Sequence, residues 1–235
     1  MSDLRSLLVD IGNTRTKYVY CDQNGELTEV AILQGDIKSL LTGCEKVLVA
    51  SVNNPHEVQR FERTATQLGI EFLNIETRSS AFGIQCPYSQ FSKLGVDRWL
   101  CALALAKRTK KAVAIIDAGT AATCDFVFEG KYLGGWIAPG FQLMRQALVS
   151  NTVNVTADEV FPGSLEIGTD TEECVNAGCL AMLSGFVSKA EQKVASLDDD
   201  YSLIISGGSA EMLAKMTDNR FSIERDLVFQ GLKLY

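Results

Sequence analysis

Histidine is nearly absent from the sequence: His56 is the single histidine among 235 residues. This scarcity removes Ser-His-Asp and Cys-His mechanisms unless His56 itself serves. His56 directly follows Pro55, which is typical of the first residue of a helix, so a surface position at a helix start is the better interpretation. Proton transfer in this protein therefore falls to carboxylates.

The seven cysteines form an odd number and include no C-x-x-C pair. Most lie in apolar stretches, which is typical of small buried hydrophobic residues in a reducing compartment. With one histidine and no cysteine cluster, the sequence also argues against a zinc site.

Prolines number only four, and no stretch rich in Ser, Gly or Pro separates one region of the chain from another. The length of 235 residues exceeds that of most single domains, and hydrophobic residues make up 46%, enough for a sizeable core. We therefore expect either one large domain or two closely coupled ones.

Positive charge is also scarce, since the formal net charge is -7. A general nucleic-acid-binding surface would need a basic stripe, and the one basic run, Lys107 to Lys111, ends a helical stretch, where it meets water. No apolar segment reaches membrane-spanning length, and the N-terminal residues lack a signal-peptide cleavage pattern. We expect a cytoplasmic protein with neither nucleic acid nor membrane as a partner.

One short stretch near the start carries a pattern of polar residues at a turn: SLLVDIGNTRTKYVY, from Ser6 to Tyr20. It predicts a strand over 7–11, a two-residue turn at Gly12-Asn13 and a second strand over 16–21. In that register Ile11 faces Thr14, Asp10 faces Arg15 and Leu8 faces Lys17. Asp10 and Lys17 are then diagonal neighbours on one face of the sheet.

Such a hairpin suits a nucleotide phosphate. Glycine lets the backbone approach closely, and turn N–H groups and the Thr14 hydroxyl can donate to an anion. Asp10 can hold Mg²⁺ while Lys17 neutralises phosphate oxygens. The alternative is an ordinary hairpin with a surface ion pair, and this stretch taken alone favours that alternative, because short motifs match often by chance.

The pattern then recurs. The segment from Ala112 to Thr120 is again an apolar strand ending in Asp-x-Gly, and its Asp117 lies 107 residues after Asp10 (117 − 10), close to half the chain. Two further strands are expected over 122–128 and 131–137. Recurrence at half-chain spacing indicates a duplicated pair of domains that clamp a nucleotide. It favours phosphate-binding hairpins over ordinary surface hairpins, which the first stretch alone had favoured.

Four motifs in order carry a family resemblance. They are D-x-G-N-T-x-x-K at Asp10 to Lys17, G-x-D-R at Gly95 to Arg98, D-x-G-T-A-x-T-x-D at Asp117 to Asp125, and G-G-x-I-x-P-G at Gly134 to Gly140. The chain resembles type III pantothenate kinase, of the actin, hexokinase and heat-shock ATPase superfamily, over nearly its whole length.

The resemblance implies an α/β fold of two ribonuclease H-like domains, each a mixed sheet flanked by helices, over residues 1–109 and 110–235. It implies ATP-dependent phosphorylation of pantothenate to 4′-phosphopantothenate, the first step of coenzyme A biosynthesis. It also implies Mg²⁺ with the ATP, a monovalent cation (K⁺ or NH₄⁺) at Asp117, and a homodimer.

Site residues follow from the same resemblance. It assigns ATP and its phosphates to Asp10, Ile11, Gly12, Asn13, Thr14, Arg15, Thr16, Lys17 and Thr120. It assigns pantothenate to Tyr88, Gly95, Val96, Asp97, Arg98 and Thr171, with Asp97 accepting the proton of the attacking hydroxyl.

Each assignment has a structural alternative. Asp97 can be a helix cap, Arg98 a solvated residue and Tyr88 a loop-packing residue. Thr169 competes with Thr171, because this loop carries Asp170 where the family more often has asparagine.

Two rival functions remain open from the sequence. Another small-molecule kinase of the superfamily would keep both hairpins but need not have the G-x-D-R helix start. A non-catalytic nucleotide-binding regulator is the second rival.

Overall fold

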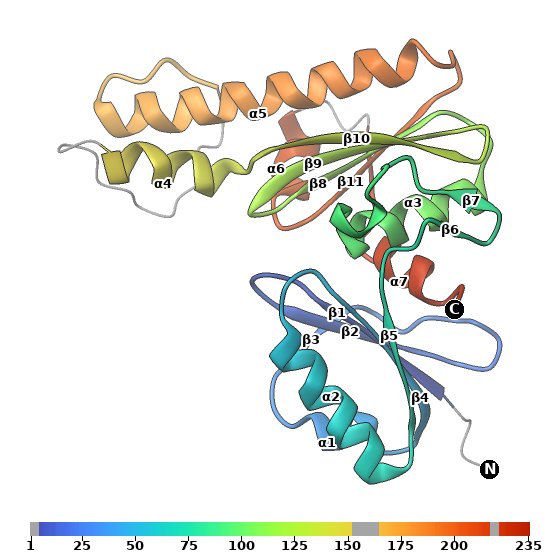
Figure 1. Ribbon diagram of the computed structural model, residues 1–235. Coiled ribbons are helices and arrows are strands. Elements are labelled where there is room, and N and C mark those ends of the chain that lie inside the picture. The colour runs from blue at the N-terminus through green and yellow to red at the C-terminus, as the bar shows by residue number, and fades with distance from the viewer. Residues whose placement is uncertain (1–4, 152–164, 217–220) are drawn as a thin grey trace. The chain divides into compact units, whose positions relative to one another are not determined.

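The computed structural model describes residues 5–151, 165–216 and 221–235. The chain divides into two compact units, Met1–Arg108 with Arg225–Tyr235, and Thr109–Glu224 (Figure 1). Within the described ranges, every helix is too short or too polar to cross a membrane.

The first unit is built on a five-stranded mixed sheet in the order β3-β2-β1-β4-β5. Its strands are β1 (Arg5–Ile11), β2 (Thr16–Cys21), β3 (Ala31–Ile32), β4 (Cys44–Ser51) and β5 (Glu71–Ile75). The first three form an antiparallel meander, and β4 and β5 run parallel to β1. The carboxyl ends of β1, β4 and β5 therefore lie at one edge of the sheet.

Both faces of this sheet are buried under helices, which explains the nearly continuous apolar run of β1. Alternate residues Leu7, Val9 and Ile11 pack with α1 (Ile37–Leu41) and α2 (Pro55–Leu68). On the opposite face Leu8 packs with α3 (Val96–Arg108) and α7 (Leu227–Leu232). Each such leucine contributes about 1.5–3 kcal/mol by burial.

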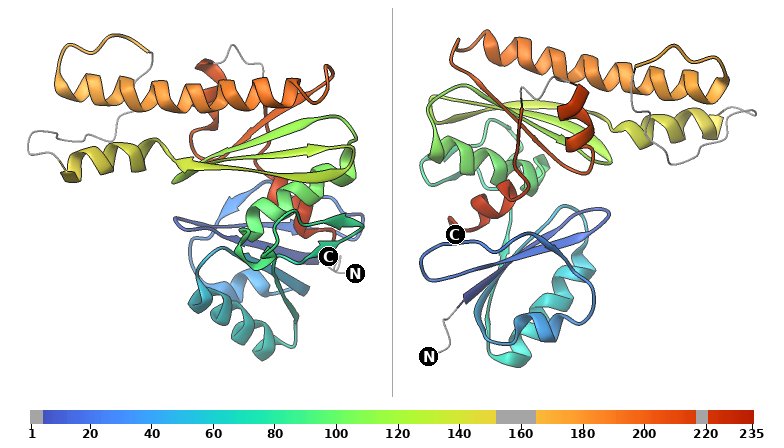
Figure 2. Two further views of the ribbon diagram at one scale, coloured as in Figure 1. Left: turned by 45° about the horizontal axis from the view of Figure 1, so that its top comes forward. Right: turned by 180° about the vertical axis from the view of Figure 1, so that it is seen from behind.

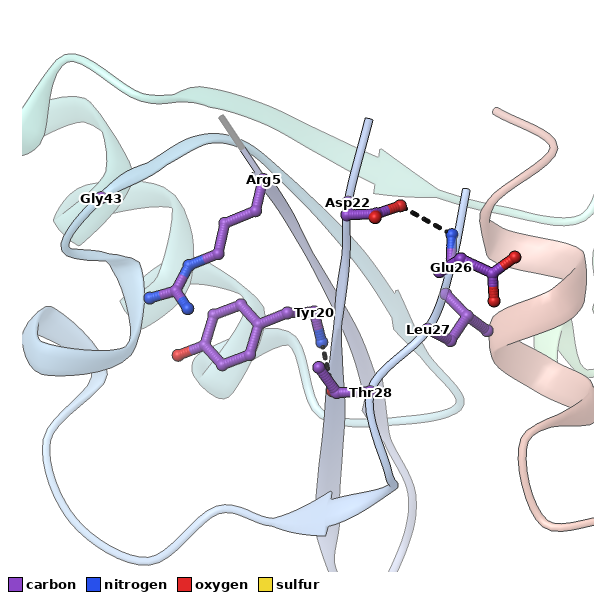
Figure 3. A pocket seen from close by; sticks show the side chains of 7 residues that line it. All are labelled: Arg5, Tyr20, Asp22, Glu26, Leu27, Thr28 and Gly43. Carbon is purple, nitrogen blue, oxygen red and sulfur yellow. Dashed lines mark hydrogen bonds between the residues drawn. The ribbon is translucent and has the colours of Figure 1, made fainter. Parts of the chain in front are cut away.

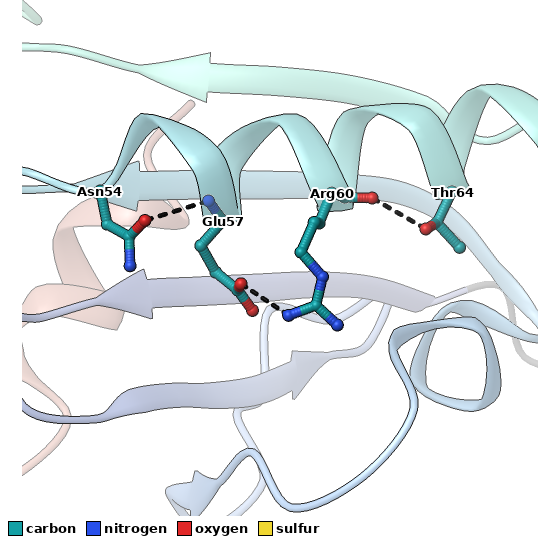
Figure 4. A network of polar contacts seen from close by, with 4 residues as sticks. All are labelled: Asn54, Glu57, Arg60 and Thr64. Atoms are coloured by element: carbon teal, nitrogen blue, oxygen red, sulfur yellow. Dashed lines mark hydrogen bonds and ion pairs between the residues drawn. The ribbon is translucent and has the colours of Figure 1, made fainter.

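Helix α2 shows how the sequence sets a helix's limits (Figure 4). The Asn54 side chain accepts the Glu57 N–H at 3.1 Å, and Gly69 ends the helix at φ +70°. Glu57 forms an ion pair with Arg60 at 2.7 Å, one turn along the helix. His56 is exposed in the first turn, as predicted.

Between β5 and α3 the first unit carries a small hairpin and a single turn of 3₁₀ helix. The hairpin consists of β6 (Ser80–Ala81) and β7 (Ile84–Gln85), and the turn is η1 (Phe91–Lys93). This segment leads directly into the G-x-D-R sequence at the start of α3.

The last helix lies in the first unit, whereas the sequence-based boundaries put residues 225–235 in the second domain (110–235). Phe229 and Leu232 are buried in the core that contains Leu100 of α3. A Cβ atom at Gly231 would lie 2.3 Å from the Leu100 carbonyl oxygen, so the two helices meet backbone to backbone. Contact with α3 therefore corrects the assignment of these residues.

The second unit repeats the plan of the first, with the strand order β10-β9-β8-β11-β12. These strands are β8 (Val113–Ala118), β9 (Ala121–Phe128), β10 (Lys131–Pro139), β11 (Ser202–Ser206) and β12 (Ser222–Ile223). An antiparallel meander again precedes two strands parallel to the first. The predicted duplication of a mixed α/β domain is confirmed.

Three helices of the second unit pack with one face of its sheet to form a single core. They are α4 (Phe141–Asn151), α5 (Thr171–Ala195) and α6 (Ala210–Met216), and α4 lies alongside α5 (Figure 2). Cys124 and Cys179 belong to this core. All seven cysteines are free thiols; five are buried as predicted, Cys86 is half-buried and Cys174 is exposed.

Candidate active site

The β1–β2 hairpin has a longer loop than predicted. Asp10 pairs directly with Lys17, and Ile11 with Thr16, so four residues, Gly12 to Arg15, form the loop. The Gly12 N–H donates to the Arg15 carbonyl at 3.1 Å, and Gly12 does not adopt the left-handed conformation that a two-residue turn requires. The predicted register, with Asp10 opposite Arg15, is therefore wrong.

The observed register brings Asp10 and Lys17 closer than a diagonal arrangement, because directly opposed residues lie on the same face of the sheet. That face is the one covered by α3 and α7, since Leu8 and Val19, two residues away on each strand, belong to that core. Asn13, Thr14 and Arg15 are exposed at the loop tip. A carboxylate can bind Mg²⁺, and an ammonium group and exposed polar loop groups can bind phosphate oxygens.

The second hairpin has the same construction with a shorter loop. Asp117 pairs with Thr123 and Ala118 with Ala122, which leaves the three residues Gly119 to Ala121 in the turn, and Gly119 and Thr120 are exposed. The Gly119 N–H donates to the carbonyl of Ala121, the last turn residue, at 3.0 Å, and in the first hairpin the Gly12 N–H likewise donates to the carbonyl of the last loop residue, Arg15. Each unit therefore presents an Asp-x-Gly turn at the end of its first strand.

Oxygen atoms converge beside Asp117 where β11 ends. A Cβ at Gly207, which has φ +89°, would lie 2.3 Å from Asp117 Oδ1 and 2.7 Å from the Ala118 carbonyl oxygen. Glycine is required here by both its conformation and the close approach. Carboxylate and carbonyl oxygens are ligand types that bind cations, K⁺ among them.

Glycine also closes the end of β10. The Gly140 N–H donates to the Thr120 carbonyl at 2.9 Å, and a Cβ at Gly140 would lie 2.1 Å from the Gly119 carbonyl oxygen. The G-G-x-I-x-P-G motif thus holds the second Asp-x-Gly turn in place through backbone contact.

The start of α3 places Asp97 in the first helical turn. Gly95 is the capping residue, because its carbonyl accepts the Trp99 N–H at 3.1 Å, and Asp97 Oδ1 accepts the Arg98 N–H at 2.7 Å. A Cβ at Gly95 would lie 2.5 Å from Asp97 Oδ1, so the carboxylate folds back over the glycine. Asp97 thus satisfies one backbone donor and remains half-buried rather than enclosed.

Arg98 and Tyr88, separated by ten residues, meet in the first unit. Arg98 is 7% exposed, and its Nη1 donates to the Tyr88 hydroxyl at 3.1 Å. The hydroxyl fixes one edge of the guanidinium plane, which orients a group suited to bidentate binding of a carboxylate. Val96, beside them, is buried in the core with Leu8.

At the start of α5 the structure separates the two competing threonines. Thr169 donates from its N–H and hydroxyl to Glu173 Oε2 at 2.8 and 2.9 Å, while the Asp170 side chain caps the helix through the Glu173 N–H. Thr171 is the first helical residue and is exposed. Thr169 is therefore engaged in capping, which favours Thr171 as the ligand-facing residue.

Both threonines line a cavity of about 810 Å³ between α4 and α5, with Leu148, Cys174 and Met182 among its other walls. Arg145, which is 2% exposed, lies 3.7 Å from Glu172 in the first turn of α5.

Burial raises the pKa of the Cys179 thiol more than the charge of Arg145 lowers it. Cys179 is therefore a protonated, packing thiol at neutral pH rather than a nucleophile.

A second cavity, of about 490 Å³, lies at the other end of β1 from Asp10 (Figure 3). Arg5 stacks over the Tyr20 ring, 3.9 Å from its centroid, and burial raises the pKa of Tyr20 more than Arg5 lowers it. Asp22 accepts the N–H groups of Glu26 and Asn24, which lower its pKa. Each of these side chains has a partner within the first unit, and the cavity lies at the opposite end of β1 from the Asp-x-Gly turn.

The final aspartate of D-x-G-T-A-x-T-x-D, Asp125, has no role among the residues predicted from the sequence. Asp125 is 2% exposed, and its Oδ1 accepts the Tyr132 hydroxyl at 2.6 Å, which joins β9 to β10. Among the described residues, no group of three or more His, Cys, Asp or Glu side chains could hold a metal ion. A magnesium ion bound by one carboxylate and by substrate phosphates needs no such cluster.

Two units with one strand order, each opening with an Asp-x-Gly hairpin, define the class of kinases and ATPases with a duplicated actin-like fold. Solved structures agree on the fold. A protein from Campylobacter jejuni described as a Baf-family transcriptional activator superposes with a TM-score of 0.62 at 20% identity, covering 97% of this chain and 96% of that one. A protein from Listeria monocytogenes described as an N-acetylmannosamine kinase gives 0.52 at 15% identity, covering 98% of each.

Sequence comparison then identifies the family. The model of type III pantothenate kinase matches residues 6–193. The type III pantothenate kinase of Pseudoalteromonas atlantica is 35% identical over 237 residues, which span 98% of this chain and 96% of the relative. The chain belongs to the type III pantothenate kinase family, and the resemblance carried by the four motifs is confirmed.

Proposed function

We propose that this protein transfers the γ-phosphoryl group of ATP to the primary hydroxyl of pantothenate, forming 4′-phosphopantothenate and ADP in the first step of coenzyme A biosynthesis. The observation that carries the proposal is the start of α3, where Asp97 lies over Gly95 and Arg98 is held by Tyr88. An Asp-x-Gly hairpin occurs in both units, whereas the G-x-D-R helix start occurs once and is the motif through which the family resemblance assigns Asp97 and Arg98 to pantothenate.

Asp97 orients the attacking hydroxyl and accepts its proton. Its carboxylate already receives one N–H bond, and the first helical turn favours its ionised form, which makes it a weak base. Phosphoryl transfer passes through a loose transition state, so positioning of the hydroxyl matters more than strong deprotonation. An ionised aspartate that positions the hydroxyl is therefore adequate for this reaction.

The phosphates are bound by the turns. In the first unit Asp10 to Lys17 supply a backbone loop, hydroxyl groups and the Lys17 ammonium group, and in the second unit Thr120 supplies a hydroxyl at the equivalent turn. Asp10 would hold Mg²⁺, which neutralises phosphate charge when it is bound with ATP. Thr171 is proposed to contact pantothenate.

Arg98 is proposed to bind the pantothenate carboxylate. We expect Arg98→Lys to raise the KM for pantothenate about tenfold with a smaller effect on kcat, because a point charge cannot reproduce a bidentate contact. Steady-state kinetics with varied pantothenate measure this. Arg60→Lys alters the ion pair with Glu57 on α2 instead and should leave both constants unchanged. An unchanged KM in the Arg98 variant would remove Arg98 from the carboxylate site.

Asp117 is proposed to bind a monovalent cation with the neighbouring carbonyl oxygens. We expect activity to collapse when Na⁺ replaces K⁺ or NH₄⁺ at matched ionic strength, and Asp117→Asn to raise the K⁺ concentration needed for half-maximal rate. Initial rates across a potassium titration measure both effects. Equal rates in sodium and potassium would contradict the proposal.

We also propose a cytoplasmic homodimer that has neither a membrane nor nucleic acid as a partner. Light scattering of the purified protein should give about twice the mass of one chain, 25.6 kDa. A fully active monomer at the assay concentration would exclude the dimer.

A single assay tests the activity itself. ADP release is measured with ATP, Mg²⁺ and K⁺ on a panel of hydroxyl compounds, including pantothenate, N-acetylmannosamine and glucose. The proposal predicts turnover with pantothenate far above the others. Turnover on a sugar alone indicates another kinase of the fold, and nucleotide binding without any turnover indicates a regulator.

A further inference from the structure

Thr77 makes a buried contact that no motif of the sequence indicates. It lies two residues beyond the end of β5, is 9% exposed, and its hydroxyl donates to the Leu94 carbonyl oxygen at 2.8 Å. Leu94 directly precedes Gly95. The bond therefore joins the carboxyl edge of the first sheet to the start of α3 across 17 residues of chain.

Three consecutive backbone contacts then lead into the helix. The Leu94 N–H donates to the Phe91 carbonyl at 3.0 Å, the Leu94 carbonyl accepts from Thr77, and the Gly95 carbonyl accepts the Trp99 N–H at 3.1 Å. The peptide planes on both sides of Leu94 and the plane that follows Gly95 are thereby each held by a hydrogen bond. Since Leu94 is itself only 3% exposed, water is poorly placed to replace the Thr77 hydroxyl.

The other end of the Thr77 contact is tied to the phosphate hairpin. Asp10 of β1 pairs with Ala50 of β4, and Ala50 pairs with Ile75 of β5, so the three form one row across the sheet. Thr77 follows this row by two residues. The sheet row, Thr77 and Leu94 thus connect Asp10, which is proposed to hold Mg²⁺, with the helix start that carries Asp97, which is proposed to orient the hydroxyl.

We infer that Thr77 is a positioning residue for phosphoryl transfer, which holds the Gly95–Arg98 helix start, and with it Asp97, in register with the Asp10 row of the sheet. The inference rests on the proposed function. Phosphoryl transfer depends on near-linear alignment of the hydroxyl and the phosphorus atom, so a small displacement of Asp97 lowers the rate without weakening nucleotide binding.

Thr77→Val tests the inference, because valine keeps the shape of threonine and removes the hydroxyl. We expect kcat to fall about tenfold while the KM for ATP stays within twofold, since the β1–β2 hairpin is not altered. Thr77→Ser keeps the hydroxyl and should restore most of the rate. Thr64→Val is the matched control, because it removes a hydroxyl that donates to a backbone carbonyl on α2, at 2.8 Å.

Folding is checked by circular dichroism and thermal unfolding of each variant. If Thr77→Val does not fold, the comparison moves to Thr77→Ser against Thr77→Ala, which differ in the hydroxyl alone. Wild-type turnover in Thr77→Val, or equal loss in the serine variant and its hydroxyl-free counterpart, would overturn the inference. Absence of pantothenate turnover in the wild-type protein would instead overturn the proposed function.

Discussion

Asp97→Asn should lower kcat for pantothenate phosphorylation by at least about a hundredfold, because loss of a general base typically costs about 10²–10⁴-fold. Asparagine keeps the size of the side chain and an Oδ1 atom that can accept the Arg98 N–H, so the first turn of α3 remains capped. The neutral amide of asparagine, unlike the Asp97 carboxylate, cannot accept the proton of the attacking hydroxyl. Steady-state kinetics with saturating ATP and pantothenate give the fall directly.

Two further measurements separate catalysis from structure. The melting temperature and the affinity for ATP should be nearly unchanged in Asp97→Asn, because neither the helix cap nor the phosphate hairpin is affected. Asp36→Asn supplies the control: Asp36 caps α1 by accepting the Ser39 N–H at 3.3 Å, on the face of the sheet opposite α3. It should leave kcat unchanged. Near-normal turnover of Asp97→Asn would make Asp97 a structural residue of the helix start.

The duplicated fold could be predicted because its signal lies in local sequence. An apolar strand that ends in Asp-x-Gly occurs at Asp10 and again at Asp117, and each is followed by strand and turn residues. Both sheets accordingly have the same order, with the first strand at the centre. Local pattern and global topology agree here, which is the condition under which such inference succeeds.

The register of the first hairpin could not be predicted, because loop length depends on backbone angles that the residue types leave open. Gly12 permits the left-handed conformation but does not adopt it, and its N–H bond to Arg15 lengthens the loop to four residues. The change moves Lys17 directly opposite Asp10. Residue identity thus indicated the chemistry of the turn but not its geometry.

Long-range contacts were the other source of error. Helix α7 packs on α3, with Gly231 against the Leu100 carbonyl, and no periodicity near the end of the chain specifies that partner. The Thr77 hydroxyl likewise donates to a backbone carbonyl, which any residue at position 94 would provide. Contacts to backbone atoms leave little trace in a single sequence.

Gly95→Ala should produce a second large effect, a fall in kcat of about a hundredfold, because a displacement of about 1 Å at a reacting group can cost that much. The added methyl group would lie 2.5 Å from Asp97 Oδ1, well inside van der Waals contact, so the carboxylate must turn away from its position. Nucleotide binding in the β1–β2 hairpin is not altered, and the KM for ATP should change little. Gly95→Ala should therefore lower kcat and leave ATP binding nearly unchanged, as Asp97→Asn does, although the Asp97 carboxylate keeps its charge.

Gly185→Ala provides the matched control for that experiment, since nothing lies within 4 Å of a Cβ at Gly185 on the exposed side of α5. Alanine there should raise stability by up to about 1 kcal/mol, as expected for a helix interior, and leave kcat unchanged. Gly95 does not have a left-handed φ, so Gly95→Ala adds steric contact with Asp97 and no backbone strain. If Gly95→Ala retained wild-type kcat, the Asp97 carboxylate would not need its observed position, and Asp97 could not act as the orienting base proposed here.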